Sequence, residues 1–393
     1  MQRRAFVQLL GGGVILGPGL GGCTQAMPAE AIAAWAEAGR DDAANADPRR
    51  WALGHAVLAP HSHNLQSWLV DLSRPGEIEL RCDLTRLLPE TDPWSRQIMM
   101  SQGTFIELLE IALRERGQRA EVQLFPEGPP GPRQLDARPV ARLRVTPDAA
   151  VPKDPLFATI KRRHTNRLAY APQRRIGADA WQAMAAAAAA AVQPQAQPLA
   201  FGHVDAAQPE LLARHRALAN EAWRIELETP RTFLESLKVM RVGAAEVAKY
   251  RDGLTLLDPM VVALDKLGLF DRSKAPPPDS FAVRSQIKDF AQKMDSTAAF
   301  LWLTSEGNER ATQVNAGRAY ARVQLAATAA GLVMQPLSQA LQEYPEMAAP
   351  YAEVHRLLGA APPRQTVQMW ARIGHAPSAG PAPRRGLQAH LRG

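Results

Sequence analysis

The chain has 393 residues, of which 46% are hydrophobic, 22% charged and 6% aromatic. This composition is that of a globular protein with room for two or three domains, and it excludes disordered, collagen-like and coiled-coil chains. The 46 Lys and Arg against 39 Asp and Glu give a net charge of +7 without a long basic block, which disfavours a dedicated nucleic-acid binder. Two cysteines, Cys23 and Cys82, cannot build a disulfide framework or a cysteine-rich zinc site.

The N-terminus has the features of an export signal. Arg3 and Arg4 precede a weakly apolar, glycine-rich stretch without acidic residues, and together they resemble a twin-arginine signal, which is read by machinery that exports folded proteins. Residues 20–23 resemble a lipobox, in which the Cys23 sulfur is acylated. We therefore expect residues 1–23 to be a signal. The protein would be periplasmic or lie on the outer face of a membrane, held there by lipid on Cys23.

Helical and strand patterns alternate in the first half of the chain. Residues 24–48 are expected to form an Ala-rich N-terminal linker, helical or loosely ordered. Over residues 49–153 the sequence predicts a helix at 51–58, a hairpin of strands 67–72 and 77–82, a helix at 95–116, and strands 120–125 and 141–145. Apolar spacing near 3.6 residues predicts the long helix, and the turn at 74–76 predicts the hairpin.

The second half, residues 154–393, continues the alternation. Its predicted helices lie at 154–163, 179–191, 209–228, 308–330 and 344–358, and its predicted strands at 199–204, 298–304 and 366–373. Residues 229–280 are irregular and hold three consecutive prolines, which predicts an inserted cap of short helices. Because helices and strands interleave in both halves, the sequence predicts an α+β fold with a sheet in each half.

A polar turn precedes the first strand of the hairpin. Its Ser62, Asn64 and Gln66 offer the neutral donors and acceptors that recognition of a planar heteroaromatic ring requires. His61 and His63 also suggest a metal site, but no Asp, Glu or Cys at ligand spacing supports one. A solvated polar loop is the alternative interpretation.

A basic cluster lies near the start of the second half. Arg163, His164, Thr165 and Arg167 form a pattern that can clamp phosphate through charge-assisted hydrogen bonds. Contact with nucleic acid is a weaker alternative, since aromatic residues are not interleaved with the basic ones. A solvated helix end is the third interpretation.

Two further motifs lie near the C-terminus. A helix containing Gly317 ends at Gly331, whose loop could bring main-chain N–H groups to a ligand. Arg372 belongs to the last predicted strand, and Arg384 with Arg385 follows in a proline-rich tail. A buried helix with a glycine cap and a solvated tail are the alternatives.

Taken in order, these motifs resemble the nitroreductase superfamily and, more narrowly, its Acg-like FMN-binding branch, whose members carry two nitroreductase-like halves in one chain. The resemblance covers roughly residues 50–388. It is carried by Ala59-Pro60, Ser62, Asn64-x-Gln66-x-Trp68, Arg163-His164-Thr165-x-Arg167, Gly317, Leu325-x-Ala327, Gly331-Leu332, Arg372-Ile373-Gly374 and Arg384-Arg385. Two positions depart from the family pattern: His61 replaces a Ser, and Ser67 replaces a Pro.

The resemblance implies two α/β/α halves that form an intrachain pseudo-dimer, with FMN as the cofactor. The resemblance places Ser62 and Asn64 toward the ring and ribityl chain, Arg163, His164 and Thr165 toward the phosphate and ribityl oxygens, Gly331 near the reactive ring nitrogen, and Arg384 or Arg385 at the phosphate, with Gln66 and Arg167 as further FMN-binding residues. No side chain is required as an acid or base.

The two halves divide the site motifs between them. The first half has the Ser62–Gln66 loop and the second half has the Arg-His-Thr cluster, and neither repeats the other's motif. We therefore expect a monomer with one composite FMN site. The implied activity is electron transfer from an unidentified reduced donor to a small aromatic acceptor, a nitro compound or quinone. The alternatives are an FMN-storing envelope protein without turnover and an envelope lipoprotein without a cofactor.

Overall fold

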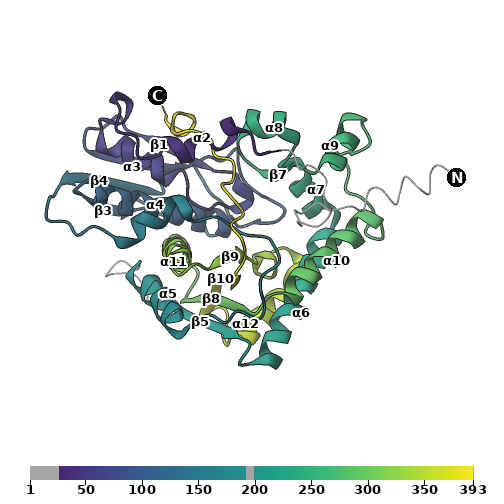
Figure 1. Ribbon diagram of the computed structural model, residues 1–393. Helices are drawn as coiled ribbons and strands as arrows, with labels where there is room; N and C mark the ends of the chain where they lie inside the picture. The colour runs from purple at the N-terminus through teal and green to yellow at the C-terminus, as the bar shows by residue number, and fades with distance from the viewer. Residues whose placement is uncertain (1–25, 192–198, 393) are drawn as a thin grey trace.

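Two four-stranded antiparallel sheets lie on either side of a pair of long helices in the computed structural model, which describes residues 26–191 and 199–392 (Figure 1). The predicted α+β class is confirmed. The predicted signal, with Arg3, Arg4 and Cys23, lies outside the described residues. Among the helices that the structure describes, none combines the length and apolar character needed to span a membrane.

The first sheet is covered by helices on one face only. It contains β1 (Trp68–Asp71), β2 (Glu77–Cys82), β4 (Ala141–Pro147) and β3 (Gln118–Leu124), in that spatial order. Its inner face packs against α2 (Ala29–Glu37), α3 (Pro48–Ala56) and α4 (Arg96–Glu115). The outer face carries charged side chains, where Glu79 pairs with Arg81 at 2.6 Å and with Arg142 at 2.8 Å. This half therefore has two layers rather than the three of an α/β/α arrangement.

The second sheet is covered on both faces. It contains β5 (Leu199–Asp205), β8 (Ala299–Glu306), β10 (Gln365–Gly374) and β9 (Val333–Pro336), in that spatial order. One face packs on α5 (Ala178–Ala190) and α11 (Arg310–Ala329), and the other on α6 (Pro209–Glu228), α10 (Phe281–Asp295) and α12 (Ala348–Leu357). Neighbouring residues of β8 consequently serve different cores: Phe300 faces α6 and α10, and Leu301 faces α11.

The two sheets have the same connectivity. Along the chain, each is formed by two strands, then a long helix, then two more strands. The long helices α4 and α11 cross between the sheets (Figure 1). Gly103 and Gly317 lie at the crossing, each the eighth residue of its helix. A Cβ on Gly103 would lie 1.9 Å from the Val314 carbonyl oxygen, and one on Gly317 would lie 1.8 Å from that of Met100. Only glycine permits this approach.

Two segments of the second half reach the first half. The cap comprises α7 (Pro230–Lys238), β6 (Met240–Val242), α8 (Gly243–Tyr250), β7 (Leu254–Leu256) and α9 (Pro259–Lys266). The C-terminal tail, residues 375–392, returns from β10 to the first sheet, where Leu391 bridges Val70 and the Arg384 N–H donates to the Ala31 carbonyl. The tail thus packs on the half to which the sequence did not assign it.

Several elements differ from the sequence prediction. The expected linker, predicted as helical or loosely ordered, contains helix α2, and what differs is that its Trp35 is buried in the first core. Residues 155–162, expected within an α-helix, form the 3-10 helix η3 (Pro155–Arg162). Helix α10 and the edge strand β9 were not predicted. Helix α10 buries only four side chains on a mostly polar sequence, so its apolar periodicity is weak.

Candidate functional site

The turn that begins with the 3-10 helix η2 (Ser62–Asn64) has an unusual backbone. His63, Asn64 and Gln66 have φ angles of +46°, +55° and +54°, in the left-handed region that favours glycine. A non-glycine residue in such a conformation costs about 1–3 kcal/mol and persists where surrounding contacts enforce it. Clustered strain of this kind is typical of ligand-binding turns.

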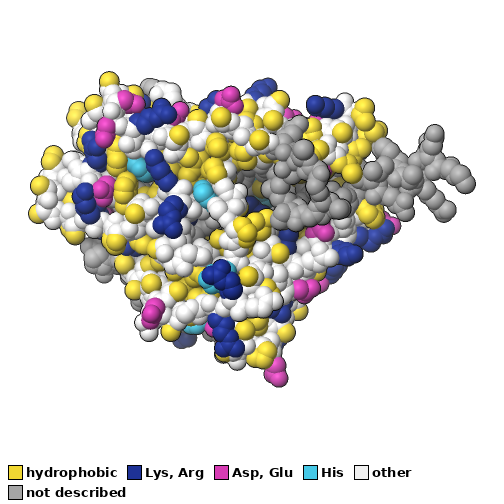
Figure 2. All heavy atoms as spheres, viewed as in Figure 1, with side chains coloured by type: hydrophobic (Ala, Val, Ile, Leu, Met, Phe, Trp, Pro, Cys, Tyr) yellow, Lys and Arg dark blue, Asp and Glu magenta, His cyan; other side chains and the backbone are white. Residues whose placement is uncertain are grey.

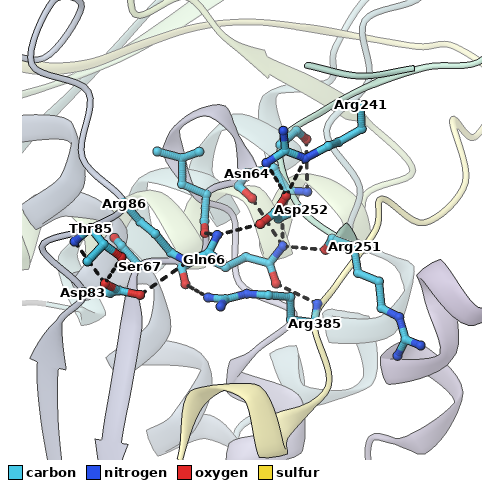
Figure 3. Close-up of polar contacts among 12 residues, drawn as sticks. Asn64, Gln66, Ser67, Asp83, Thr85, Arg86, Arg241, Arg251, Asp252 and Arg385 are labelled. Carbon is cyan, nitrogen blue, oxygen red and sulfur yellow. Dashed lines mark hydrogen bonds and ion pairs between the residues drawn. The ribbon is translucent and has the colours of Figure 1, made fainter. Parts of the chain in front are cut away.

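The amides of Asn64 and Gln66 are held by the cap and the tail (Figure 3). The Gln66 Nε2 donates to the Arg251 carbonyl at 2.9 Å, and its Oε1 accepts from the Arg385 N–H at 2.9 Å. The Asn64 Oδ1 accepts from Arg384 at 2.6 Å. The two side chains that the sequence assigned to the flavin therefore brace the turn that carries them.

Asp252 fixes the cap beside this turn. Its carboxylate is 2% exposed and pairs with Arg86 of the first half at 2.5 Å and with Arg241 of the cap at 2.9 Å (Figure 3). A second contact joins His63 to Ser236 of α7, with Nε2 and Oγ 3.3 Å apart. The cap and the turn are thus connected by both charged and neutral contacts.

Two buried guanidinium groups converge beneath the turn. Arg163 and Arg384, 1% and 4% exposed, both donate to the Leu58 carbonyl, at 2.9 and 3.3 Å. Among the described residues neither pairs with a carboxylate, and the Nε of each lacks a partner. Burial lowers the pKa of Arg163 to about 10 and, with the positive charge of Arg163 adding to the effect, that of Arg384 to about 9. This is a buried positive site whose neutralising anion is not supplied by the described chain.

His164 and Trp35 complete this arginine site. The His164 ring lies 5.0 Å from the Trp35 ring, and both guanidinium carbons lie over that indole, at 6.0 Å for Arg163 and 5.6 Å for Arg384. Both His164 ring nitrogens are buried without a hydrogen-bond partner. Burial and the two guanidinium charges lower the His164 pKa to about 4, so the ring is neutral at pH 7.

A second group of cations lies around Arg167. Burial is the main cause that lowers the Lys293 pKa to about 8, with Arg372 and Arg167 adding to it, and the Lys293 Nζ has no hydrogen-bond partner. The Tyr320 hydroxyl, near Arg163 and Arg167, also lacks one. Arg167 has exposed surface, and desolvation by the surrounding protein nevertheless lowers its pKa.

The remaining predicted residues have structural contacts of their own. The Ser62 N–H donates to the Ser101 Oγ at 3.1 Å. Thr165 pairs with Met334 in an isolated bridge at the end of the second sheet. Gly331 ends α11 with φ +71°, and its N–H donates to the Thr328 carbonyl, so this N–H is used within the helix cap. The structure brings Arg163, His164 and Arg384 together and leaves Gly331 exposed.

Sequence reasoning missed three members of the site: Trp35, Lys293 and Tyr320. Trp35 lies in the segment expected as a linker, and Lys293 lies on the helix that was not predicted. Tyr320 belongs to the Gly317 motif, which carried the signal but was interpreted as a packing helix. Each lies more than a hundred residues from Arg163, so only the fold makes them its neighbours.

His61 and His63 do not form a metal site. The His61 Nδ1 donates to the Ser62 carbonyl at 2.8 Å, and its Nε2 accepts from the Ser67 N–H at 3.1 Å. Burial lowers the pKa of His61 to about 3 and that of His63 to about 4. Over residues 26–191 and 199–392, no three His, Cys, Asp or Glu side chains are grouped as metal ligands.

Comparison with known proteins gives two similar curated chains. They are the candidate NAD(P)H nitroreductases of Mycobacterium tuberculosis strains CDC 1551 / Oshkosh and H37Rv. Each is 29% identical over 357 residues, which cover 87% of this chain and 90% of the relative. No family model matches the chain.

Solved structures give weaker overlays. The FMN-dependent nitroreductase NfnB of Mycobacterium smegmatis, solved with NADPH, overlays with a TM-score of 0.37 at 18% identity, over 60% of this chain and 96% of NfnB. A Bacteroides fragilis nitroreductase with bound FMN gives 0.32 at 15% identity, over 59% and 94%. Scores this low do not place two whole chains in one fold.

Proposed function

We propose that the chain binds one FMN between the Ser62–Gln66 turn and the Arg163–Arg167 segment, and that it is an FMN-dependent oxidoreductase of the nitroreductase type. The observation that carries this proposal is the arginine site. Arg163 and Arg384 are buried together without a carboxylate, beside a His164 whose ring nitrogens are both free. The 29% identity to the two mycobacterial relatives over most of both chains also supports it.

A phosphate group suits the arginine site on charge. Burial of two guanidinium groups that pair with no carboxylate carries a desolvation penalty that a nearby anion would offset. A phosphate monoester carries about −1.5 to −2 charges at pH 7 and three strong acceptor oxygens. The free Nε of Arg163 and of Arg384, with a donor nitrogen of His164, would serve such oxygens.

Arg167 and Lys293 would act on the part of the flavin that gains and loses electrons. FMN, when bound, supplies the chemistry by accepting a hydride equivalent and returning two electrons to an acceptor. The positive charges of Arg167 and Lys293 would stabilise the negative charge that reduction adds to the ligand. Lys293 is 8% exposed, and burial of this kind strengthens such stabilisation.

The acceptor is a small aromatic nitro compound or a quinone, and the names of the mycobacterial relatives support NAD(P)H as the donor. The chain is an intrachain pseudo-dimer of Acg-like type, supported by the common strand order of the two sheets and by the Gly103–Gly317 crossing. This arrangement leaves one functional flavin site per chain.

The cap supports a second candidate function, flavin storage without turnover. Cap residues Ser236, Arg251 and Asp252 contact the turn or the first half directly, so the cap covers the proposed site from one side. A covered flavin is shielded from a soluble reductant. Export would also remove the protein from the cytoplasmic NAD(P)H pool.

We further propose that residues 1–23 direct export by the twin-arginine route and that Cys23 is acylated. FMN is made in the cytoplasm, and the proposed site needs both halves of the folded chain. A route for folded proteins would let the cofactor bind before the membrane is crossed. Lysine substitutions of Arg3 and Arg4 should then trap the precursor in the cytoplasm, as a fractionation blot would show.

The binding test compares Arg163→Ala and Arg384→Ala with a control, Arg356→Ala. Arg356 is exposed on α12 and pairs only with Glu353, so its loss should leave flavin affinity unchanged. Each site variant should lose roughly 1.5–3 kcal/mol of FMN binding, a 10- to 150-fold weaker Kd by fluorescence titration. Riboflavin, which lacks the phosphate, should bind all four proteins about equally.

Stoichiometry and redox cycling separate the candidate functions. One flavin per chain is expected from absorbance against protein mass, and two would refute the composite site. Bleaching by a reductant followed by reoxidation with a nitroarene or quinone identifies an enzyme. Yellow protein inert to both is a flavin store, and protein that stays colourless with added FMN refutes the flavin site.

A further inference from the structure

Helix α9 in the cap is apolar on the side that faces away from the protein. Its inner side buries Val261, Val262 and Leu264. Met260 and Leu267, seven residues apart and therefore on one side of the helix, are 41% and 71% exposed. Ala263 lies exposed between them, and Leu269 is 43% exposed just beyond the helix. We name these four residues, Met260, Ala263, Leu267 and Leu269, the outer face of α9.

Such a helix is unusual on the surface of a soluble protein. Its only charged residues are Asp265 and Lys266 at its C-terminal end, and its other exposed side chains are apolar, whereas a surface helix normally presents a polar face to water. Large exposed apolar side chains are few in this structure: of the five recorded over the described residues, three belong to the outer face of α9. Their clustering points to an interaction surface, since single exposed apolar residues need no explanation.

The start of the described chain lies beside the cap. Met27 packs against Val247 of α8 and Leu257, in a small cluster with Ala31 of α2. Figure 1 shows α2 beside α8, and α9 beyond α8 on the same side of the molecule. Cys23 precedes Met27 by four residues, which span at most about 14 Å when fully extended. A lipid on Cys23 would therefore hold the bilayer close to the cap.

Charge does not mark this surface as a nucleic-acid or acidic-protein site. Residues 249–280 carry five basic and five acidic side chains, and Arg272 is paired with both Glu246 and Asp265. On the face that Figure 2 shows, Lys and Arg are spread among apolar and acidic side chains. Attraction to this segment must therefore come from its apolar area.

We propose that the outer face of α9 inserts into the lipid bilayer to which acylated Cys23 tethers the chain. Amphipathic and apolar helices of this kind lie in the interface with their apolar side chains about 5–10 Å into the headgroup and acyl boundary. Tethering converts insertion into an intramolecular step, so a small apolar face suffices. The inference rests on the proposed acylation of Cys23 and is independent of the flavin.

The test places a fluorescent label at Leu267→Cys in the full-length acylated protein in phosphatidylcholine vesicles. Gln123→Cys is the matched control, because Gln123 is exposed on β3, at the opposite end of the molecule from α9 (Figure 1). Cys82 is buried and burial raises its pKa to about 12, so it will not take the label. Brominated acyl chains should quench the Leu267→Cys label several-fold more than the control.

Further arms identify what covers the outer face. Quenching should be insensitive to salt and to anionic lipid, because the segment carries no net charge. It should fall when Met260→Ser and Leu269→Ser are added to the labelled protein. Equal quenching at both positions overturns the proposal. So does protection of the Leu267→Cys label from aqueous iodide without quenching by bromolipid, which would mean that the chain's own N-terminal segment or another protein covers it.

The outcome can be separated from failure of the flavin proposal. Flavin absorbance in the same vesicles reports the cofactor site directly and does not enter the quenching ratio. If Cys23 carries no lipid, protein with either label remains in solution and does not bind the vesicles. This result also overturns the insertion proposal. A protein that is quenched as expected but colourless would support insertion and refute flavin binding.

Discussion

His61 and Ser67 are hydrogen-bond partners across the strained turn. The His61 Nε2 accepts from the Ser67 N–H at 3.1 Å and lies 2.7 Å from the Ser67 Oγ. These are the two positions at which the turn departs from the pattern that it resembles. A proline at position 67 would remove the N–H on which His61 depends. The two departures therefore form one matched pair, and the turn keeps its shape by a different contact.

Gly103 and Gly317 set the distance between α4 and α11, so a larger side chain at either position is expected to destabilise the protein. Gly103→Ala or Gly317→Ala would place a Cβ within 2 Å of a backbone oxygen, so the helices must separate. We expect each substitution to lower the free energy of unfolding by at least about 3 kcal/mol, the upper range for overpacking. Urea denaturation measures the change.

Gly177→Ala is the control for this prediction. Gly177 has an ordinary φ of −69°, and a Cβ there meets no heavy atom within 4 Å. Its substitution should change the free energy of unfolding by less than about 0.5 kcal/mol. Equal effects at Gly177 and Gly103 would show that the crossing is not the tight contact that the structure indicates.

The residues of the site could be predicted only in part. The arginines and the turn were found because their chemistry is visible in short motifs. The bracing of Asn64 and Gln66 was not, because it depends on Arg251 and Arg385, which lie far along the chain. Lys293 and Trp35 contribute through burial, which a sequence motif does not display.

At the scale of elements, one carboxylate of α7 adds three hydrogen bonds to the contacts that hold the cap to the first half. Glu235 of α7 accepts from the Glu90 N–H at 2.9 Å, the Thr91 N–H at 2.9 Å and the Thr91 hydroxyl at 2.6 Å. Glu235→Ala should cost about 1.5–3 kcal/mol, the usual loss for a hydrogen-bonded charge. We expect faster hydrogen exchange at the amides of Glu90 and Thr91 and across α7.

The matched control for the cap is Glu353→Ala. Glu353 lies on α12 at the surface and pairs with Arg356 and Arg214, so its removal should leave exchange in α7 unchanged. Unaltered exchange in Glu235→Ala would contradict the role of this carboxylate in holding the cap. A uniform increase over the whole chain would show global rather than local destabilisation.

The long elements followed from sequence patterns, and the short or polar ones did not. Helix α4 lies within one residue of each predicted end, because its apolar periodicity runs over twenty residues. The edge strand β9 has four residues and pairs only with β10 and the bridge to Thr165, so local pattern could not identify it. Local pattern also could not show that η3 is a 3-10 helix, since α9 has the same length, begins with a proline too and is an α-helix.

At the scale of the whole molecule, buried histidines make stability depend on pH. Burial lowers the pKa of six histidines from 6.5 to about 4 or below; they are His55, His61, His63, His164, His215 and His390. Between about pH 6.5 and pH 4 the unfolded chain therefore binds more protons at these sites than the folded chain. The free energy of unfolding should fall as the pH falls through this window.

Four carboxyl groups oppose this trend. Burial raises the pKa of Asp92 and Glu226 to about 7, and it also raises the pKa of Glu110 and Glu235. Their contribution to stability decreases as the pH rises through the raised pKa values. Six histidines outnumber these four carboxyl groups, and we expect the urea midpoint to decrease from pH 6.5 to pH 4.5. A midpoint that is constant or increases on acidification would contradict the neutral state of the buried histidines.

The crossing of α4 and α11 also determines how the site responds to dilution. A site shared between two separate subunits is lost when the protein concentration falls below the dissociation constant of the dimer, because the dimer then dissociates. Here both long helices belong to one covalent chain, so their encounter is intramolecular and the law of mass action does not separate them. The arrangement also removes the symmetry that identical subunits impose, since a substitution in one half is not copied into the other. One half could thus keep the turn while the other kept the arginines.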